Sequence, residues 1–156
     1  MDKKAGWMYL ACGLIVGACA VVFAMGFALA REAILFEERI APYAAAVYGY
    51  GIGAALPPLA AVGMLGMVVR EIGRGRAFSR ENAGWMLGIA RMAAVECAYI
   101  VAGLVGWGCA GLMHPGIVIA AAALVMFGAA IGILAWALSV LIRRADALQQ
   151  ENDLTI

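Results

Sequence analysis

Four long apolar stretches make up most of this chain and leave few folds open to it. An α-helix rises about 1.5 Å per residue, so about 20 apolar residues cross a hydrocarbon core roughly 30 Å thick. Each stretch exceeds that length, and 66% of all residues are hydrophobic against 13% charged. Backbone amides in lipid must be bonded within the span, so the spans should be helices. The sequence therefore predicts an all-α polytopic membrane protein, a four-transmembrane-helix bundle with spans at about residues 5–30, 43–69, 84–111 and 116–142.

One domain, residues 1–156, is expected, because no hydrophilic segment between the spans is long enough to fold separately. It would end in a short hydrophilic tail, residues 143–156. A cleaved secretory signal is the competing interpretation of the N-terminus, since two lysines precede an apolar run that closes on Ala28-Leu29-Ala30. That run is much longer than the roughly 7–15 residues of a signal core, so it is interpreted as a retained membrane helix.

Basic residues are distributed unevenly between the connections. Lys and Arg favour the cytoplasmic side of short loops. The N-terminus has two lysines, the second connection has four arginines, and Arg143 and Arg144 follow the last span, whereas the third connection has no basic residue. This asymmetry predicts an N-in/C-in, multi-pass protein of a cytoplasmic membrane. The basic residues beside the bilayer also suit anionic lipid headgroups.

Prolines and glycines inside the spans should shape their packing. Pro57-Pro58 removes two backbone donors near the middle of the second span and should kink that helix. Small residues spaced four apart let membrane helices approach closely, either within one chain or between two copies. Examples on three different spans are Gly13/Gly17, Gly84/Gly88 and Gly128/Gly132.

The chain lacks the usual patterns of enzyme chemistry. Its four cysteines all fall inside spans and none forms a Cys-x-x-Cys pair, which argues against thiol–disulfide exchange. His114 is the only histidine and lies in the third connection, so haem held by two histidines is excluded. No phosphate-binding loop is present. We expect a protein that is not an enzyme and that needs no cofactor or metal.

One charged group lies deep in the membrane. Glu96 falls near the midplane of the third span, where a carboxyl costs a few kcal/mol and is a functional-site hypothesis by default. Arg91 points roughly 140° away from Glu96 around the axis of the same helix, and its long side chain can extend its charged group to the membrane surface. Candidate hydrogen-bond partners for Glu96 are Tyr99, Tyr48 and Tyr50. Two interpretations stay open: a proton-coupled or cation-binding site, and a protonated carboxyl hydrogen-bonded inside the bundle.

Two hydrophilic motifs are expected on the cytoplasmic side. In the second connection, Ser79 is a good N-cap, flanked by Phe78 and Ala83 at hydrophobic-staple positions. This loop should therefore be ordered. The tail turns acidic after Arg144 and ends in Leu-Thr-Ile, which could dock on a partner by strand addition or in a groove. A frayed tail is the alternative.

The two motifs carry a family resemblance. Gly75-x-Ala77-Phe78-Ser79-x-Glu81-Asn82, together with the terminal Glu-Asn-Asp-Leu-Thr-Ile, resembles the bacterial four-helix membrane proteins of the DUF2975 family. In length, span count and motif placement the resemblance extends over essentially the whole chain. Members of this family have no established catalytic activity and are often encoded beside a small helix-turn-helix regulator.

The resemblance implies a signalling or sequestering partner of such a cytoplasmic regulator, without direct nucleic-acid binding by this chain. The expected partner-binding residues are Arg74, Arg76, Phe78, Ser79, Arg80, Glu151, Asn152, Asp153, Leu154, Thr155 and Ile156. The alternative is a small proton-coupled transporter, dimeric or monomeric, centred on Glu96. A structural accessory role in a larger membrane complex is a third interpretation.

Overall fold

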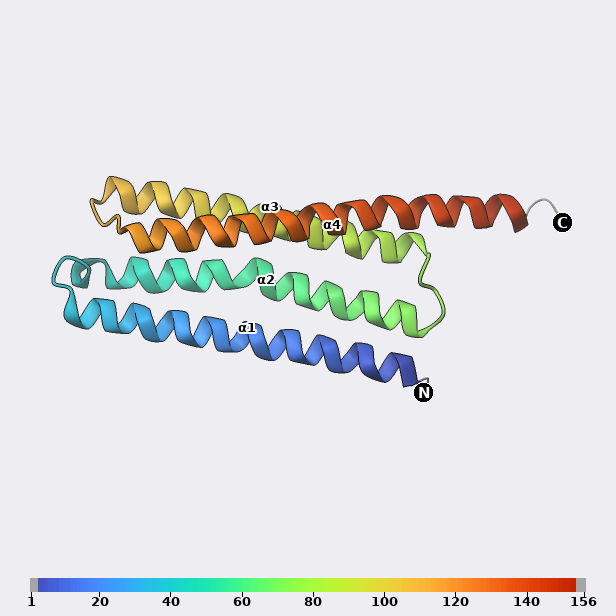
Figure 1. Ribbon diagram of the computed structural model, residues 1–156, viewed down its shortest axis with the longest axis horizontal. Helices are drawn as coiled ribbons and strands as arrows, with labels where there is room; N and C mark the ends of the chain where they lie inside the picture. Colours follow the sequence, from blue (N-terminus) through green and yellow to red (C-terminus); the bar gives the residue numbers. More distant parts are fainter. Residues whose placement is uncertain (1–2, 154–156) are drawn as a thin grey trace.

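The computed structural model describes residues 3–153 of the chain, with side chains from residue 6 to residue 151. The described part is all-α, as predicted, and contains no strand (Figure 1). Its elements are α1 (Lys3–Phe36), a 3-10 turn η1 (Ala41–Tyr43), α2 (Ala44–Gly73), α3 (Arg80–Cys109) and α4 (Pro115–Asp153).

All four α-helices are long and apolar enough to cross a membrane, which confirms the four predicted spans. Figure 1 shows both ends of the chain and the α2–α3 loop at one end of the molecule, here called the terminal side. The α1–α2 and α3–α4 connections lie at the other end, the far side. The first helix runs on to Phe36, beyond the predicted span, and the next element starts with a turn that contains Pro42.

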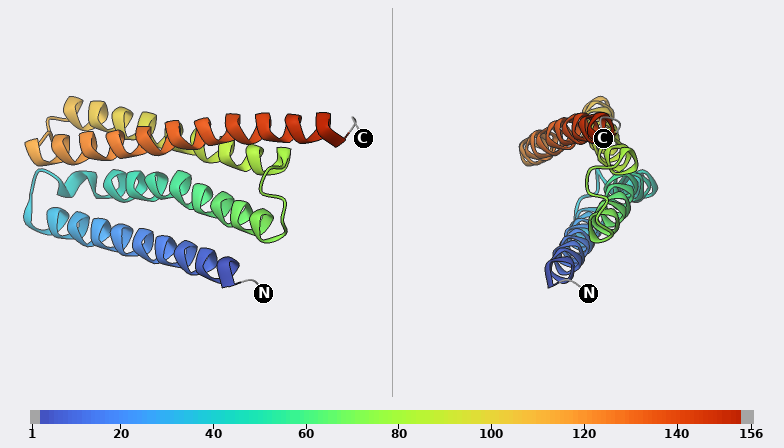
Figure 2. Two further views of the ribbon diagram at one scale, coloured as in Figure 1. Left: turned by 45° about the vertical axis from the view of Figure 1, so that its right-hand side comes forward. Right: turned by 90° about the vertical axis from the view of Figure 1, so that its right-hand side faces the viewer.

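The helices pack in chain order and form an open arrangement. The α1 helix packs on α2, α2 on α3 and α3 on α4, whereas α1 and α4 make no contact within the described residues. The end-on view in Figure 2 shows a curved row of helices in place of a closed square. The four helices therefore form an open bundle. Lipid tails are as apolar as leucine side chains, so a helix face in a membrane need not be covered by protein.

The most extensive packing lies between α3 and α4, where small residues face each other. A Cβ atom added to Gly128 would lie 2.8 Å from Cys97 Sγ, and one added to Gly132 would lie 3.3 Å from the Cβ of Ala93. The pair Gly128/Gly132 thus serves an interface within one chain. By contrast, Gly13 and Gly17 on α1 have no neighbouring group within 4 Å of an added Cβ.

The second helix stays helical through Pro57 and Pro58 and changes direction near its middle (Figure 1). Each proline lacks an amide hydrogen, so the helix loses the bonds to the carbonyls four residues earlier, those of Gly53 and Ala54. A bend near this point is the expected result.

Candidate functional site

The loop between α2 and α3 is held in place by its own motif residues. Gly75 has a φ of 78°, a left-handed conformation that glycine adopts without steric cost. Ser79 Oγ accepts a hydrogen bond from the amide of Asn82 at 3.1 Å, which is the predicted N-cap. Asn82 is 1% exposed, and its Nδ2 donates to the Ala77 carbonyl at 2.7 Å. The loop is therefore ordered, and the Ser79 side chain is used for capping.

Two of the loop arginines share one carboxylate, that of Glu71. Arg76 Nη2 lies 2.6 Å from Oε2 of Glu71 at the end of α2, and Arg74 Nη1 lies 3.4 Å from the other oxygen of the same carboxylate. Glu71 is only 8% exposed. No sequence motif pointed to a role for Glu71, although it is the one acid among four arginines between residues 70 and 80. These pairs make Arg74 and Arg76 part of the loop structure.

The loop is also joined to the last helix. Arg80 Nε lies 3.2 Å from Asp146 Oδ2 on α4, and Gln150 Nε2 donates to the same oxygen at 3.1 Å. Between these elements lies a small polar hollow of about 260 Å³. Its walls are formed by Gly75, Arg76, Phe78, Ser79, Asp146 and Gln149. The two motifs that looked separate in the sequence thus share one surface on the terminal side.

The hydrophilic tail is helical and continues α4 to Asp153. This extension of α4 projects beyond the other helices (Figure 1). Residues 143–153 are helical, whereas Leu154, Thr155 and Ile156, which are expected to dock on a partner by strand addition or in a groove, lie outside the described residues. The backbone amides of a continuing helix are bonded internally and are not free to join a strand. On this side Phe78 is 55% exposed and Leu148 on the extension is 64% exposed.

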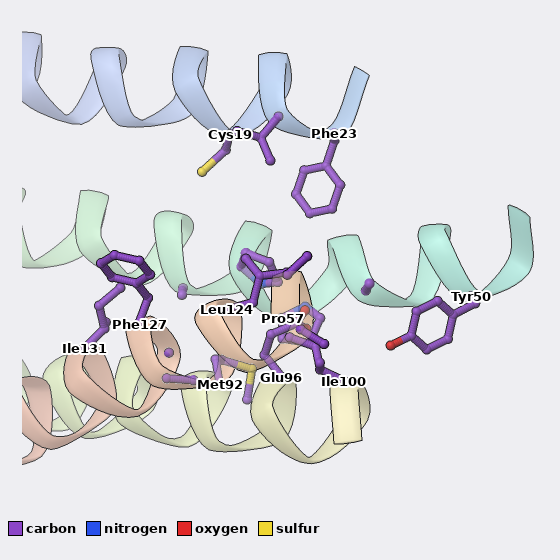
Figure 3. Close-up of a pocket in the computed structure, with 18 of the residues that line it drawn as sticks. Cys19, Phe23, Tyr50, Pro57, Met92, Glu96, Ile100, Leu124, Phe127 and Ile131 are labelled. Atoms are coloured by element: carbon purple, nitrogen blue, oxygen red, sulfur yellow. The ribbon is translucent and has the colours of Figure 1, made fainter. Parts of the chain in front are cut away.

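A second site lies within the spans, where an apolar groove of about 650 Å³ runs between α1 and α4 with α2 and α3 at its base. Figure 3 shows Cys19 and Phe23 on one side of it and Leu124, Phe127 and Ile131 on the other. Its walls are formed by Ala18, Cys19, Val22 and Phe23 of α1; Tyr50, Ala54, Pro57, Pro58 and Ala61 of α2; Ile89, Met92, Ala93, Glu96, Ile100, Leu104 and Trp107 of α3; and Ile117, Ala120, Ala121, Leu124, Phe127, Gly128 and Ile131 of α4.

Glu96 lies at the base of this groove, near Pro57 and Ile100 (Figure 3). Its Oε2 atom is buried and has no hydrogen-bond partner in the described part of the chain. Arg91 does not line the groove and is exposed. The intramembrane carboxyl is therefore surrounded by apolar side chains, with no basic residue on the groove walls.

The three tyrosines considered as hydrogen-bond partners of Glu96 contact other groups. The rings of Tyr50 and Tyr99 stack with centroids 4.8 Å apart. Tyr99 Oη donates to the Tyr50 carbonyl at 3.2 Å, and Tyr50 Oη donates to the Tyr99 carbonyl at 3.5 Å. Tyr48 stacks on Phe27 of α1. Of the three, only Tyr50 lines the groove together with Glu96, and its role in the structure is to tie α2 to α3.

Four apolar membrane-length helices connected by short loops define a multi-pass α-helical membrane protein. Within that class, the model of the family described as protein of unknown function (DUF2975) matches residues 36–156, and the chain belongs to this family. The match includes the loop motif and the tail but starts at the last residue of α1, so it is shorter than the whole-chain resemblance expected. Comparisons with curated proteins and with solved structures gave no match.

Proposed function

We propose that this protein is a membrane-bound partner of a small cytoplasmic helix-turn-helix transcription regulator, which it holds at the bilayer or releases on a signal. The class of regulator comes from the family resemblance. The observation that carries the proposal is the 3.2 Å ion pair between Arg80 and Asp146, which joins the loop to the helical extension of α4. Joined in this way, they form one continuous platform on the terminal side.

Within the platform, the extension of α4 is the part that suits a basic protein partner. Phe78 and Leu148 are large apolar side chains that are 55% and 64% exposed. Apolar groups exposed together on a surface are typical of a contact site for another molecule. The extension carries Asp146 and Glu151 and no basic residue after Arg144. DNA-binding proteins carry excess positive charge to neutralise phosphates, so an acidic helix with an apolar contact point complements them.

The proposal places the terminal side in the cytoplasm of a bacterial cell, and a fusion experiment tests this placement. The positive charges at residues 70–80 and at Arg143 and Arg144 support it. Green fluorescent protein fused after Ile156 should fluoresce, and alkaline phosphatase inserted after Glu38 on the far side should be active. Active phosphatase at Ile156 would reverse the orientation and remove the platform from the cytoplasm.

Photo-crosslinking in native membranes tests the partner. A photoreactive amino acid replaces Phe78 or Leu148 in the full-length chain, and mass spectrometry identifies the crosslinked protein. We expect the same helix-turn-helix protein at both positions and its absence when the probe replaces Phe36, which is 79% exposed on the far side. Different proteins at the two positions, or one without a DNA-binding fold, would contradict the proposal.

Truncation tests the contribution of the tail. A chain ending at Gln150 lacks residues 151–156, and its crosslinking yield at Phe78 should fall about tenfold, or about 1.4 kcal/mol of binding free energy. A second variant, Arg74→Gln with Arg80→Gln, neutralises two exposed arginines of the loop. The proposal fails if both variants capture the regulator as well as the unchanged chain does.

A second candidate function, proton-coupled transport centred on Glu96, is favoured by the unpartnered carboxyl oxygen in the groove. Glu96→Gln keeps the size of the side chain and removes its ability to exchange a proton. Proton-coupled uptake into proteoliposomes should then be lost while crosslinking at Phe78 and Leu148 continues. Unchanged uptake by Glu96→Gln would rule this candidate out.

A further inference from the structure

We propose that the groove is a binding site for a lipophilic organic cation, for example a hydrophobic amine, whose charged centre lies at the Glu96 carboxylate. The inference shares the groove and Glu96 with the second candidate function and rests on it in that respect alone. It requires that a ligand binds there and not that the ligand is transported. It is independent of the platform on the terminal side.

The charge of the ligand follows from the groove walls. Glu96 is the only Asp, Glu, Lys or Arg among the residues that form them. Its buried Oε2 atom has no partner in the described residues. An isolated carboxylate in an apolar medium is costly, and a positive charge brought beside it is attracted far more strongly than in water. A cationic ligand therefore neutralises the Glu96 carboxylate, which a neutral ligand does not do.

The apolar character of the ligand follows from the remaining walls. Aromatic rings of Phe23, Tyr50, Trp107 and Phe127 come from all four helices and line the same groove. The faces of such rings attract cations, and the attraction grows when water is excluded. The volume of about 650 Å³ lies in the range of small-molecule sites, roughly 300–1,000 Å³.

The open arrangement of the helices supplies a route for such a ligand. Since α1 and α4 do not touch within the described residues, the groove opens sideways between them, where lipid tails lie in a membrane. A hydrophobic amine concentrates in the bilayer and would reach Glu96 from there. A strongly hydrated cation such as Na⁺ has no comparable path, because few polar groups line the groove to replace its water shell.

A different arrangement would leave the groove without a ligand. A protonated Glu96 could donate to the carbonyl of Ala54, which Pro58 leaves without its usual helix donor and which belongs to a residue of the groove wall. In that arrangement the carboxyl is neutral and has no preference for cations. The experiment must therefore separate binding by charge from binding by hydrophobicity.

Tetraphenylphosphonium and tetraphenylborate make this separation, because they share one shape and carry opposite charges. The full-length protein is placed in nanodiscs of zwitterionic lipid, and equilibrium binding of each labelled ion is measured against empty nanodiscs. We expect saturable binding of the phosphonium and at least tenfold weaker binding of the borate. Glu96→Gln should weaken phosphonium binding at least tenfold, whereas Glu38→Gln, at an exposed carboxyl on the far side, should leave it unchanged.

A steric pair of variants keeps the proposal testable if Glu96→Gln fails to fold. Ala120 lines the groove and is exposed, so Ala120→Trp should fill the site and abolish phosphonium binding. Ala122, two residues along α4, is exposed but does not line the groove, so Ala122→Trp is the matched control and should bind normally.

Three results would overturn the proposal: no saturable phosphonium binding by the unchanged protein, equal binding of both ions, or full binding by Glu96→Gln. The first would leave the groove to a lipid chain or to a second copy of the protein. Transport is measured separately in proteoliposomes. Binding without uptake would retain the site and reject the transport candidate, so the two can fail independently.

Discussion

At the scale of single residues, the most consequential contact is the one by which Ser139 of α4 reaches the start of α3. Ser139 is 2% exposed, and its Oγ donates to the Ala83 carbonyl at 2.8 Å. Ala83 itself is fully buried at 0% exposure. A polar side chain in a membrane interior is stabilised by such a bond, and the small volumes of both residues let the helices meet here.

Ser139→Ala should destabilise the protein by about 0.5–1.5 kcal/mol, the usual range for one hydrogen bond between membrane helices. The loss is modest because the Ala83 carbonyl still has its own helix donor. Ser139→Leu should cost more, since Ala83 leaves no room for the larger side chain. Unfolding in mixed micelles measures both, with Ala122→Leu on an exposed face of the same helix as the control.

The N-cap of α3 is a second contact at this scale. Ser79→Ala removes the oxygen that accepts from the Asn82 amide, and such a change typically costs about 1 kcal/mol. Ser79→Asp supplies another good capping oxygen and should restore most of the loss. Hydrogen exchange of residues 75–82 measures the effect, and equal exchange in the two variants would contradict the capping role.

At the scale of helices, pairing depends on where glycine is placed and not on how much of it a helix contains. On α4, a Cβ at Gly132 would lie 3.3 Å from the Ala93 side chain of α3. On α1, Gly13 has the same spacing to Gly17 but no neighbour within 4 Å of an added Cβ. The same sequence pattern thus fixes one helix pair and leaves the other face open.

Gly132→Leu should therefore separate α3 from α4 and destabilise the protein, whereas Gly13→Leu should leave its stability within about 0.5 kcal/mol, as for other open positions. Unfolding in mixed micelles compares the two. A large loss for Gly13→Leu would show that α1 packs against a second copy of the chain, and a change in oligomeric state would accompany it.

At the scale of the whole molecule, the first helix is attached on one side alone. It packs on α2 and on the short turn η1, and it lies almost entirely outside the family match at residues 36–156. The groove owes its opening to this arrangement, because a closed bundle would bring α1 against α4. Its depth, by contrast, is fixed by α2 and α3, which the tyrosine pair holds together.

Spin labels on exposed positions test this arrangement in a chain whose native cysteines are replaced. The distance distribution between Leu14 on α1 and Met126 on α4 should be broad, because no contact joins these helices directly. Between Val95 on α3 and Met126 it should be narrow. Equal widths would contradict an open arrangement.

The sequence by itself determined the number of helices, their order and the presence of a carboxyl near the middle of the third span. Four apolar runs of bilayer length allow no other backbone solution, since unpaired amides are too costly in lipid. The capping of α3 by Ser79 was also readable, because it depends on residues that are adjacent in the chain.

Only the tertiary structure decided which groups meet. The pairing of Arg80 with Asp146, the burial of Glu71 among arginines and the opening between α1 and α4 all depend on contacts between distant segments. In lipid the hydrophobic effect does not drive helices together, so apolar periodicity says little about which face is covered by protein. Close packing of small side chains makes that choice, and it becomes visible only when the helices are placed in space.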